Sequence, residues 1–364
     1  FDANALRKLF RPDGSYLLVA TTGEVFKLHI HTNHPDVVFR KAARLGRIEE
    51  RKVDDMLRQR EERADRARAR EGLGDQPAGT AIVCDSTADL PAELRERHGI
   101  TMVPLQILFG DRVYRDQRDL SSDEFYRRLA GGEIPTTSQP PPRAFVEALE
   151  SIRADRPVVI LTLAAGLSGT IRSAHSGAEL AAQERVRVID SRSASLGLGL
   201  QALGAARLAE RGAGPEEIAR WIERWREVTG IAFTVQTLEY LRRGGRVGRA
   251  AGLLGGLLGV RPVLTWNGEE VKAEAKARGD EDAFGKVMAA VARRVPDGAR
   301  ARFGIVHADR PREAERAEEA LRSRWNVVEL VHAGFTGVIG AHTGPGTWGV
   351  VWQLVPDDDP LDPA

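Results

Sequence analysis

A strand–turn–helix unit recurs along the chain from Thr80 to Gly212, and this repetition constrains the fold more than any other feature. Short apolar runs such as VVILTL, residues 158–163, lead through turns of small polar residues into segments with helical patterning. Alternating strands and helices of this length are typical of βαβ units with parallel strands in one sheet. We therefore predict an α/β domain over residues 80–230. Its expected strands lie at 80–85, 100–109, 157–163 and 186–190.

The pattern changes after about Ile231, where strand-like segments follow one another with fewer helices between them. Asn267-Gly268 separates two of these segments, and this dipeptide favours a two-residue type I′ hairpin turn because both positions require positive φ. Three further strand-like segments, ARFGIVHAD, NVVELVHAG and TWGVVWQLV, accompany one helical stretch. We therefore predict a second, mixed α+β domain over residues 231–355.

Composition divides the rest of the chain. Residues 1–57 are expected to form a partial α+β domain, and because the chain begins with Phe1 we expect that a preceding segment is missing. Residues 58–79 contain a run of Arg, Ala and Glu with no large apolar side chain, which predicts a charged helix or linker. Residues 356–364 are acidic and rich in proline, which predicts a disordered tail.

The overall charge gives no reason to expect a nucleic-acid partner. Lys and Arg together number 53 and Asp and Glu number 52, so neither sign dominates. No stretch approaches the roughly 18 apolar residues of a membrane span. Cys84 is the single cysteine, which excludes an internal disulfide and fits a reducing compartment. We expect a cytoplasmic protein with at most transient membrane contact.

The sequence GLSGT, residues 166–170, raises the question whether Ser168 is a nucleophile or holds an anion. It lies between an expected strand and an expected helix, where unpaired backbone N–H groups and the helix dipole favour a phosphate or carboxylate. A nucleophile elbow would carry Gly where Thr170 stands. The motif therefore favours anion binding, with Gly169 and Thr170 beside Ser168 at the edge where open α/β sheets place ligands.

Two other polar loops belong to the first predicted domain. The loop after the first strand carries Asp85, Ser86 and Thr87, which either cap the following helix or face a ligand. The loop IPTTSQP places Thr136 and Thr137 beside three prolines, and a rigid backbone with hydroxyl donors suits an oxyanion. An ordinary Ser/Thr/Pro loop remains the alternative.

In the second predicted domain, Arg246 and His342 stand in the glycine-rich sequences RRGGR and HTGPG. A guanidinium and an imidazole could both donate hydrogen bonds to a carboxylate or phosphate. The alternative is a surface arginine cluster next to a glycine that ends a helix. A serine esterase using Ser168 with His342 as its base is also conceivable, but no third member of a triad is visible. A pure interaction scaffold is the third class of function.

Nucleotide and metal motifs are weak. The sequence contains no Walker A motif and no G-x-G-x-x-G that opens a helix after a strand. His29 and His31 alternate along one expected strand, so both imidazoles could reach one ion. Two ligands fall short of the three or four in a zinc site, which favours two histidines on a solvated strand face.

Six motifs in order, DSTADLP, IPTTSQP, GLSGT, VID followed by SRSAS, LRRGGRV and HTGPG, resemble the DegV family of bacterial fatty-acid-binding proteins. The resemblance implies a two-domain α/β protein that holds one long-chain fatty acid, with the acyl tail in an internal tunnel and the carboxylate at the domain interface. It also implies the residues of the head-group site. These are Thr137 with its neighbour Thr136, Ser168 in its GLSGT loop, Arg246, His342 and, less closely matched, Arg278 in KAEAKARG.

Residues 12–56 are similar to the middle domain of a fatty acid kinase that carries a DAK2-type ATP domain. In that family the corresponding strand supplies two zinc ligands, here His29 and His31, and an upstream cysteine completes the site. No cysteine precedes them in this chain. The resemblance implies that a kinase domain, in cis or in trans, uses ATP and Mg²⁺ to convert the bound fatty acid to an acyl phosphate. The chain itself would then contribute no catalytic residue and no cofactor beyond zinc.

Overall fold

The computed structural model describes residues 2–22, 25–32, 34–48, 79–181, 184–253, 259–266 and 268–362. The chain divides into two compact units, Phe1–Ala69 and Arg70–Ala364. The division falls within the predicted charged helix or linker at 58–79, of which all but Gly79 lies outside the described residues.

The first unit contains an antiparallel strand pair and short helices. Strand β1 (Ser15–Thr22) pairs with β2 (Val25–His31). The helices are α1 (Ala3–Phe10), η1 (Arg11–Asp13) and α2 (Pro35–Ala43). Leu6 and Phe10 from α1 pack against Val19 and Val38 in a small core.

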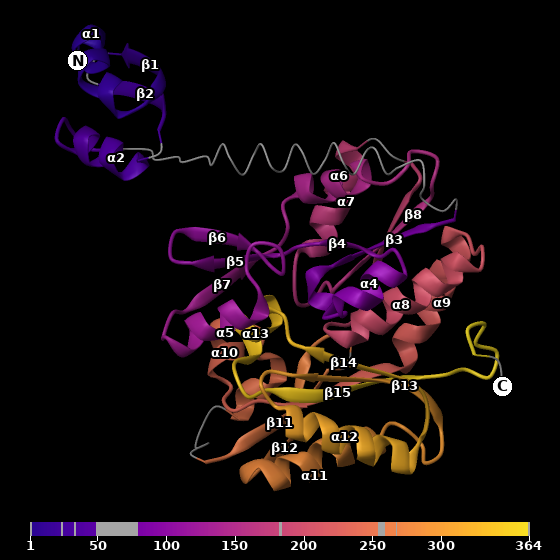
Figure 1. Ribbon diagram of the computed structural model, residues 1–364. Helices are drawn as coiled ribbons and strands as arrows, with labels where there is room; N and C mark the ends of the chain where they lie inside the picture. The colour runs from indigo at the N-terminus through magenta and orange to yellow at the C-terminus, as the bar shows by residue number, and fades with distance from the viewer. Residues whose placement is uncertain are drawn as a thin grey trace. The chain divides into compact units, whose positions relative to one another are not determined.

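A four-stranded parallel sheet organises the first lobe of the second unit, as predicted (Figure 1). Its strands, in the order β4-β3-β8-β9, are β4 (Thr101–Val103), β3 (Ala81–Asp85), β8 (Val158–Thr162) and β9 (Val186–Asp190). One face packs on α6 and α7, and alternate strand residues pack on α8. The helices of this lobe are η3 (Ser86–Ala88), α4 (Ala92–Arg97), α5 (Ser122–Ala130), α6 (Pro142–Glu150), α7 (Thr170–Leu180), α8 (Leu196–Glu210) and α9 (Pro215–Val228).

The expected strand at 100–109 is divided at Pro104. A proline has no backbone N–H to donate, so it interrupts a ladder in the sheet interior. The second half, β5 (Gln106–Phe109), instead forms the centre of a three-stranded antiparallel sheet with β6 (Arg112–Arg115) and β7 (Pro135–Ser138). Strand β7 is formed by the residues PTTS of the segment IPTTSQP, which the sequence suggested to be a loop.

The second lobe contains a six-stranded mixed sheet in the order β12-β11-β10-β15-β13-β14, which confirms the predicted mixed α+β character. Only β13 and β14 run parallel; the other pairs are antiparallel. The strands are β10 (Thr229–Thr234), β11 (Arg261–Trp266), β12 (Val271–Ala277), β13 (Arg300–His307), β14 (Asn326–Gly334) and β15 (Trp348–Leu354). The helices are α10 (Glu239–Arg243), η4 (Gly248–Leu253), α11 (Gly279–Ala292), α12 (Pro311–Arg324) and α13 (Gly337–Thr343).

The hairpin between β11 and β12 differs from its prediction. Trp266 pairs with Val271, so residues 267–270 form the connection rather than a two-residue turn. Gly268 does adopt positive φ, at 93°, whereas Asn267 lies outside the described residues.

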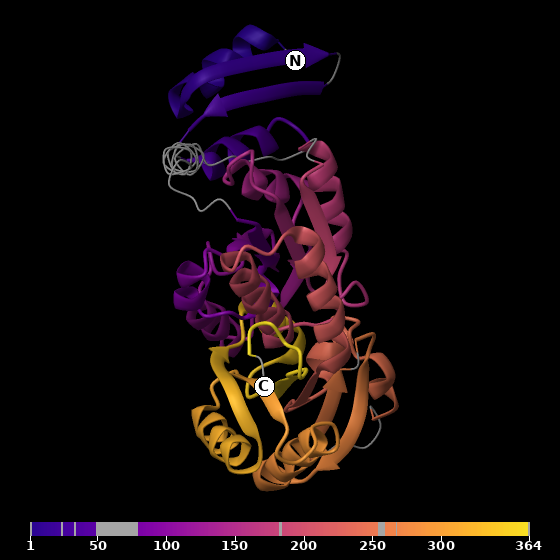
Figure 2. The same ribbon diagram turned by 90° about the vertical axis from the view of Figure 1, so that its right-hand side faces the viewer.

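Helix α8 lies between the two large sheets (Figures 1 and 2). All its residues except Arg207 and Glu210 are buried. It packs on the parallel sheet on one side and on the mixed sheet on the other, where Gly304 of β13 leaves room for Leu196. The opposite face of the mixed sheet is covered by α11 and α12. The two lobes therefore share one continuous hydrophobic core.

The prediction of a disordered tail is wrong for residues 356–362. Asp359 is fully buried, and its carboxylate accepts hydrogen bonds from both terminal nitrogens of Arg302 at 3.0 Å and from Trp225 Nε1 at 3.1 Å. A buried guanidinium needs an anionic partner, and the acidic tail supplies one. Tail composition alone did not reveal this because the partner lies on β13, far away in the sequence.

Candidate functional site

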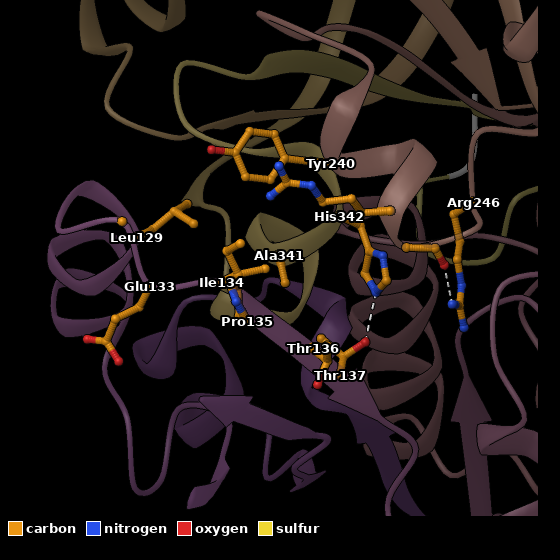
Figure 3. Close-up of a pocket in the computed structure, with 13 residues that line it drawn as sticks. Leu129, Glu133, Ile134, Pro135, Thr136, Thr137, Tyr240, Arg246, Ala341 and His342 are labelled. Atoms are coloured by element: carbon orange, nitrogen blue, oxygen red, sulfur yellow. Dashed lines mark hydrogen bonds between the residues drawn. The ribbon is translucent and has the colours of Figure 1, made fainter. Parts of the chain in front are cut away.

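Strand β7 and helix α13 face each other across a pocket of about 460 Å³ (Figure 3). Its walls come from the α5–β7 connection, β7, the end of α10 with the loop that follows, and α13. Four of the residues predicted from sequence line it, namely Thr136, Thr137, Arg246 and His342. The motifs TSQP, GGR and HTGPG are far apart in the sequence, yet residues from all three line this one pocket.

Thr137 and His342 form the central polar contact. Thr137 Oγ1 lies 2.8 Å from His342 Nε2. Successive residues of a strand point to opposite faces, and Thr136 is accordingly the more exposed of the two threonines. With its proton on Nε2, the imidazole donates to Thr137, and the threonine hydroxyl can then donate to an anion in the pocket.

His342 is held in the neutral form. Burial, and then the positive charge of Arg246, lower its pKa to about 4. Its Nδ1 is buried and has no hydrogen-bond partner among the residues that the structure describes. Gly244 lies directly against the ring, because a Cβ atom at that position would come within 2.0 Å of Nδ1. Near neutral pH the imidazole therefore acts as a hydrogen-bonding group without charge.

Arg246 brings the permanent positive charge and connects the pocket to the GLSGT loop. Its Nε donates to the carbonyl oxygen of Leu167 at 3.0 Å, and its Nη1 donates to the carbonyl oxygen of Gly244. Leu167 directly precedes Ser168. One guanidinium thus fixes the loop that follows β8 relative to the loop that follows α10.

Ser168, Gly169 and Thr170 adjoin the pocket without lining it. Ser168 Oγ lies 2.9 Å from Thr170 Oγ1 and accepts the Thr170 backbone N–H at 3.3 Å, at the start of α7. Gly169 packs on Gln139, where a Cβ atom would come within 1.9 Å of the side-chain oxygen. The GLSGT loop therefore packs on the residue that follows β7. The hydrogen-bond partner of His342 is Thr137, so the structure does not pair Ser168 with a base.

The loop after β3 takes a structural role. Asp85 is buried, and one oxygen accepts from the Thr87 backbone N–H at 3.0 Å and from the Thr87 hydroxyl at 2.5 Å. The other oxygen accepts from the backbone N–H of Leu163 at 2.7 Å, just before the GLSGT loop. Ser86 Oγ accepts from the backbone N–H of Leu105 at 3.1 Å. Of the two alternatives for this loop, the geometry supports capping.

Arg278 is not brought to the pocket. Its exposed side chain lies at the start of α11, and its backbone N–H donates to Asp282 Oδ2 at 2.7 Å. It follows β12 in the sequence, whereas the pocket is built on α10 and α13.

His29 and His31 both lie on β2 of the first unit. The His29 side chain is exposed, and the His31 side chain lies outside the described part of the structure. Within the described residues, no cluster of three or more His, Cys, Asp or Glu side chains could hold a metal ion. Zinc binding by this pair stays a prediction.

Several residues of the pocket were not found from the sequence. Arg243 and Gly244 belong to the RRGGR motif, so their signal was present but had no assigned role. Tyr240 and Leu129 line the pocket with no local sequence signal, because only the packing of α10 and α5 brings them there. Buried Asp89 and Asp116 were also missed, although Asp89 belongs to DSTADLP.

Comparison with known proteins identifies the family. Residues 79–354 match the family described as "Uncharacterised protein, DegV family". A DegV domain-containing protein from Caldanaerobacter subterraneus subsp. tengcongensis is 35% identical over 275 residues, which cover 75% of this chain and 98% of the relative. The chain belongs to the DegV family. The resemblance and the two-lobed α/β fold predicted from sequence are thus confirmed.

Solved structures of DegV proteins agree with this fold. A DegV family protein from Thermus thermophilus, described by its fatty acid binding, has a TM-score of 0.70 and 36% identity, covering 76% of this chain and 100% of its own. DegV from Bacillus subtilis, described as a fatty acid binding protein, has a TM-score of 0.69 and 33% identity, covering 77% and 100% respectively.

The first unit has a different relationship. Residues 1–63 match a second family, which is described as the middle domain of proteins similar to one component of fatty acid kinase. One chain therefore combines a DegV domain with a segment similar to part of a fatty acid kinase. No helix in the described part of the chain is both long and apolar enough to cross a membrane.

Proposed function

We propose that this DegV domain binds a long-chain fatty acid and holds its carboxylate in the pocket between β7 and α13. The observation that carries the proposal is the contact between Thr137 and neutral His342 beside the guanidinium of Arg246. The DegV structures from Thermus thermophilus and Bacillus subtilis, both described as binding fatty acid, support the choice of ligand.

The carboxylate needs partners that replace its hydration. A buried anion is costly unless hydrogen-bond donors and a positive charge receive it. The Thr137 hydroxyl supplies a donor, and the guanidinium of Arg246 supplies a positive charge. Ser168, at the start of α7, supplies a second hydroxyl once it exchanges its contact with Thr170 for the ligand.

The acyl tail would supply most of the affinity. Each buried methylene group contributes roughly 0.8 kcal/mol. Leu129, Ile134 and Ala341 give the pocket apolar walls next to its polar end. We include in the proposal that an internal tunnel holds the acyl tail.

The fatty acid would serve as a substrate for a kinase. In that reaction a carboxylate oxygen attacks the γ-phosphorus of ATP, ADP leaves, and an acyl phosphate forms. The match of residues 1–63 to a fatty acid kinase middle domain on the same chain supports this partnership. A DAK2-type domain, in cis or in trans, would supply the ATP and Mg²⁺ sites, and the DegV domain would present the carboxyl group.

Lipid analysis of the purified protein tests the binding proposal. The chain is purified from bacterial cells under native conditions and denatured, and the released molecules are identified by mass spectrometry. We expect about one fatty acid per wild-type chain and strong loss in Thr137→Val and Ser168→Ala. Ser138→Ala is the matched control, because Ser138 is exposed and follows Thr137 on β7. Thermal unfolding of each variant checks that the fold is intact.

Two other results of these experiments would contradict the proposal or support the esterase. A wild-type protein without lipid that also fails to bind added fatty acid contradicts the proposal. Hydrolysis of an ester substrate that disappears in Ser168→Ala would instead establish the esterase. Among the described residues no contact favours that alternative, since Ser168 Oγ pairs with Thr170.

A further inference from the structure

Two buried carboxyl groups of the first lobe meet the beginning of α13. Asp89 Oδ1 accepts the backbone N–H of Thr336 at 2.9 Å, and Asp116 Oδ1 accepts the backbone N–H of Gly337 at 3.2 Å. Their side chains are only 2% and 1% exposed. The first N–H groups of a helix have no partner within the helix, so these carboxyl groups supply the missing acceptors.

Asp89, which accepts the Thr336 N–H and so anchors the beginning of α13, has an unusual backbone conformation. Asp89 has a φ of 49° and Ser195 a φ of 53°, both in the left-handed region that favours glycine. The Ser195 hydroxyl donates to Asp89 Oδ2 at 2.6 Å. Such positions are kept only where surrounding contacts over-determine them, and they gather at functional sites. The contacts here fix the Asp89 carboxylate in front of α13.

Helix α13 connects this anchor to the ligand pocket. His342 lies five residues after Gly337, which corresponds to roughly 8 Å along the helix axis. Gly337 and Gly340 place the helix backbone against β5 and α5, where added Cβ atoms would come within 2.5 Å of Ile107 Cδ1 and 2.6 Å of the Tyr126 hydroxyl. These close contacts make α13 pack as one segment, so the position of its first residues sets the position of His342.

We propose that Asp89 and Asp116 form a positioning pair, which fixes the beginning of α13 and thereby sets the contact between His342 and Thr137. Neither carboxyl group touches the pocket, so both act through the helix. The role assigned to the pocket rests on the proposed function, whereas the geometric link from the pair to His342 does not.

The protonation of the pair gives this link a pH dependence. Burial raises the pKa of Asp89 to about 7, with a further contribution from the charge of Asp116, and burial raises the pKa of Asp116 to about 7. Two neighbouring carboxyl groups in a dry environment do not both ionise readily. As the pH rises through about 7, the pair loses protons, and repulsion between the two carboxylates weakens the hydrogen bonds to the beginning of α13.

Two titratable groups lie around the pair. Tyr126 on α5 has a pKa that is raised by burial and then by both carboxylates. Arg95 on α4 donates to the carbonyl oxygen of Leu90 at 3.2 Å and to Gln117 Oε1 at 3.4 Å, so its charge lies beside the residue that follows each aspartate. The other side chains that contact the two carboxyl groups are neutral. They belong to Ser86 on η3, Ser195 at the start of α8 and Thr336 just before α13. Within the described residues, no Lys or Arg forms an ion pair with Asp89 or Asp116.

The first test reads the position of His342 without any ligand. Ring ¹⁵N and ¹H resonances of His342 are followed by NMR from pH 5.5 to 8.5 in the wild type, Asp89→Asn and Asp116→Asn. His342 itself stays neutral over this range, so its signals report the pair. We expect a shift with a midpoint near pH 7 in the wild type and a loss of that shift in both Asn variants. Asp123→Asn, an exposed position on α5, is the control.

The second test measures the dissociation constant of oleate over the same pH range. If one proton on the pair is required for the ordered contact, affinity falls by up to about tenfold per pH unit above pH 7. Asp116→Asn keeps an acceptor oxygen but cannot ionise, so it should bind at pH 8 as it does at pH 6. Asp116→Ala should bind weakly at every pH.

The outcomes separate this inference from the function. His342 signals that do not move in the wild type, or that move equally in the Asn variants, overturn the positioning pair. Signals that move as expected in a protein that binds no oleate retain the pair and contradict the fatty-acid proposal.

Discussion

The residues of the pocket pack so closely that a larger side chain would not fit beside them. His342 contributes a hydrogen bond because its ring is buried and uncharged, and Gly244 keeps the ring in place by having no side chain. Arg246 supplies a positive charge beside Thr137 and His342. Small changes at these positions should therefore alter both ligand binding and stability.

Gly244→Ala tests this dependence. The added methyl group would come within 2.0 Å of His342 Nδ1, so the ring must leave Thr137. We expect at least about tenfold weaker fatty acid binding, equivalent to about 1.4 kcal/mol, and a stability loss of about 1–3 kcal/mol from overpacking. Isothermal titration calorimetry and urea unfolding measure the two effects.

Gly285→Ala in α11 is the matched control for that substitution. Nothing lies within 4 Å of the position that its Cβ would take. Alanine should stabilise the helix by up to about 1 kcal/mol and leave binding unchanged. Wild-type affinity in Gly244→Ala would show that His342 is not placed by this contact.

At the scale of secondary-structure elements, the sequence predicted what local patterns determine. The βαβ alternation predicted the parallel sheet, and the run of strands after Ile231 predicted the mixed sheet. The motifs IPTTSQP, RRGGR and HTGPG predicted Thr137, Arg246 and His342, which lie together. The position of Arg278 did not follow, because a motif fixes a residue type and only the packing of its element fixes where it points.

The errors have specific physical causes. Strand β7 was missed because its residues, PTTS, show no apolar alternation, and only pairing with β5 makes it a strand. Asp116 was missed because its role depends on α13, more than 200 residues later in the chain. The tail was missed because its order depends on the distant guanidinium of Arg302.

A substitution at Asp359 tests how much residues 356–362 contribute to stability. Burial, the largest influence, raises the pKa of this carboxyl group, but the hydrogen bond and charge of Arg302 outweigh it, and the pKa lies below its ordinary value. Asp359→Ala should cost about 3–5 kcal/mol in the free energy of unfolding, because Arg302 then remains buried without an anion. Urea unfolding at pH 7 measures the loss.

The control for this change is Asp357→Ala, because Asp357 is exposed on the same tail. The contribution of Asp359 is present above the unfolded-state pKa and is lost as the pH falls through the lower folded-state pKa. Equal stabilities of the two variants would contradict the role assigned to the tail.

For the whole molecule, the buried acids predict an unusual dependence of stability on pH. The pKa values of Asp85, Asp89 and Asp116 rise from an ordinary value of 3.8 to about 6, 7 and 7. Through these three groups the folded state binds more protons than the unfolded state between about pH 4 and 7. Neutral His342, whose pKa is lowered to about 4, contributes in the opposite sense but is a single group, so stability falls as the pH rises through this window.

Urea unfolding at intervals from pH 4.5 to 8 tests that dependence. We expect the free energy of unfolding to decrease with rising pH and then to level off above pH 7. Asp89→Asn should reduce the slope, because one titrating group is removed. A wild-type stability that increases from pH 5 to 7 would show that these groups are ionised in the folded protein at pH 5.

The burial of α8 limits how a long ligand can enter. Because this helix packs on both large sheets, separating the lobes would expose apolar surface along nearly its whole length. A clamshell motion, with the lobes swinging apart on a hinge, would therefore carry a free-energy cost that local loop movement avoids. The entrance to the pocket should open and close through its own surface segments, on the faster timescale of loops, while the lobes remain joined.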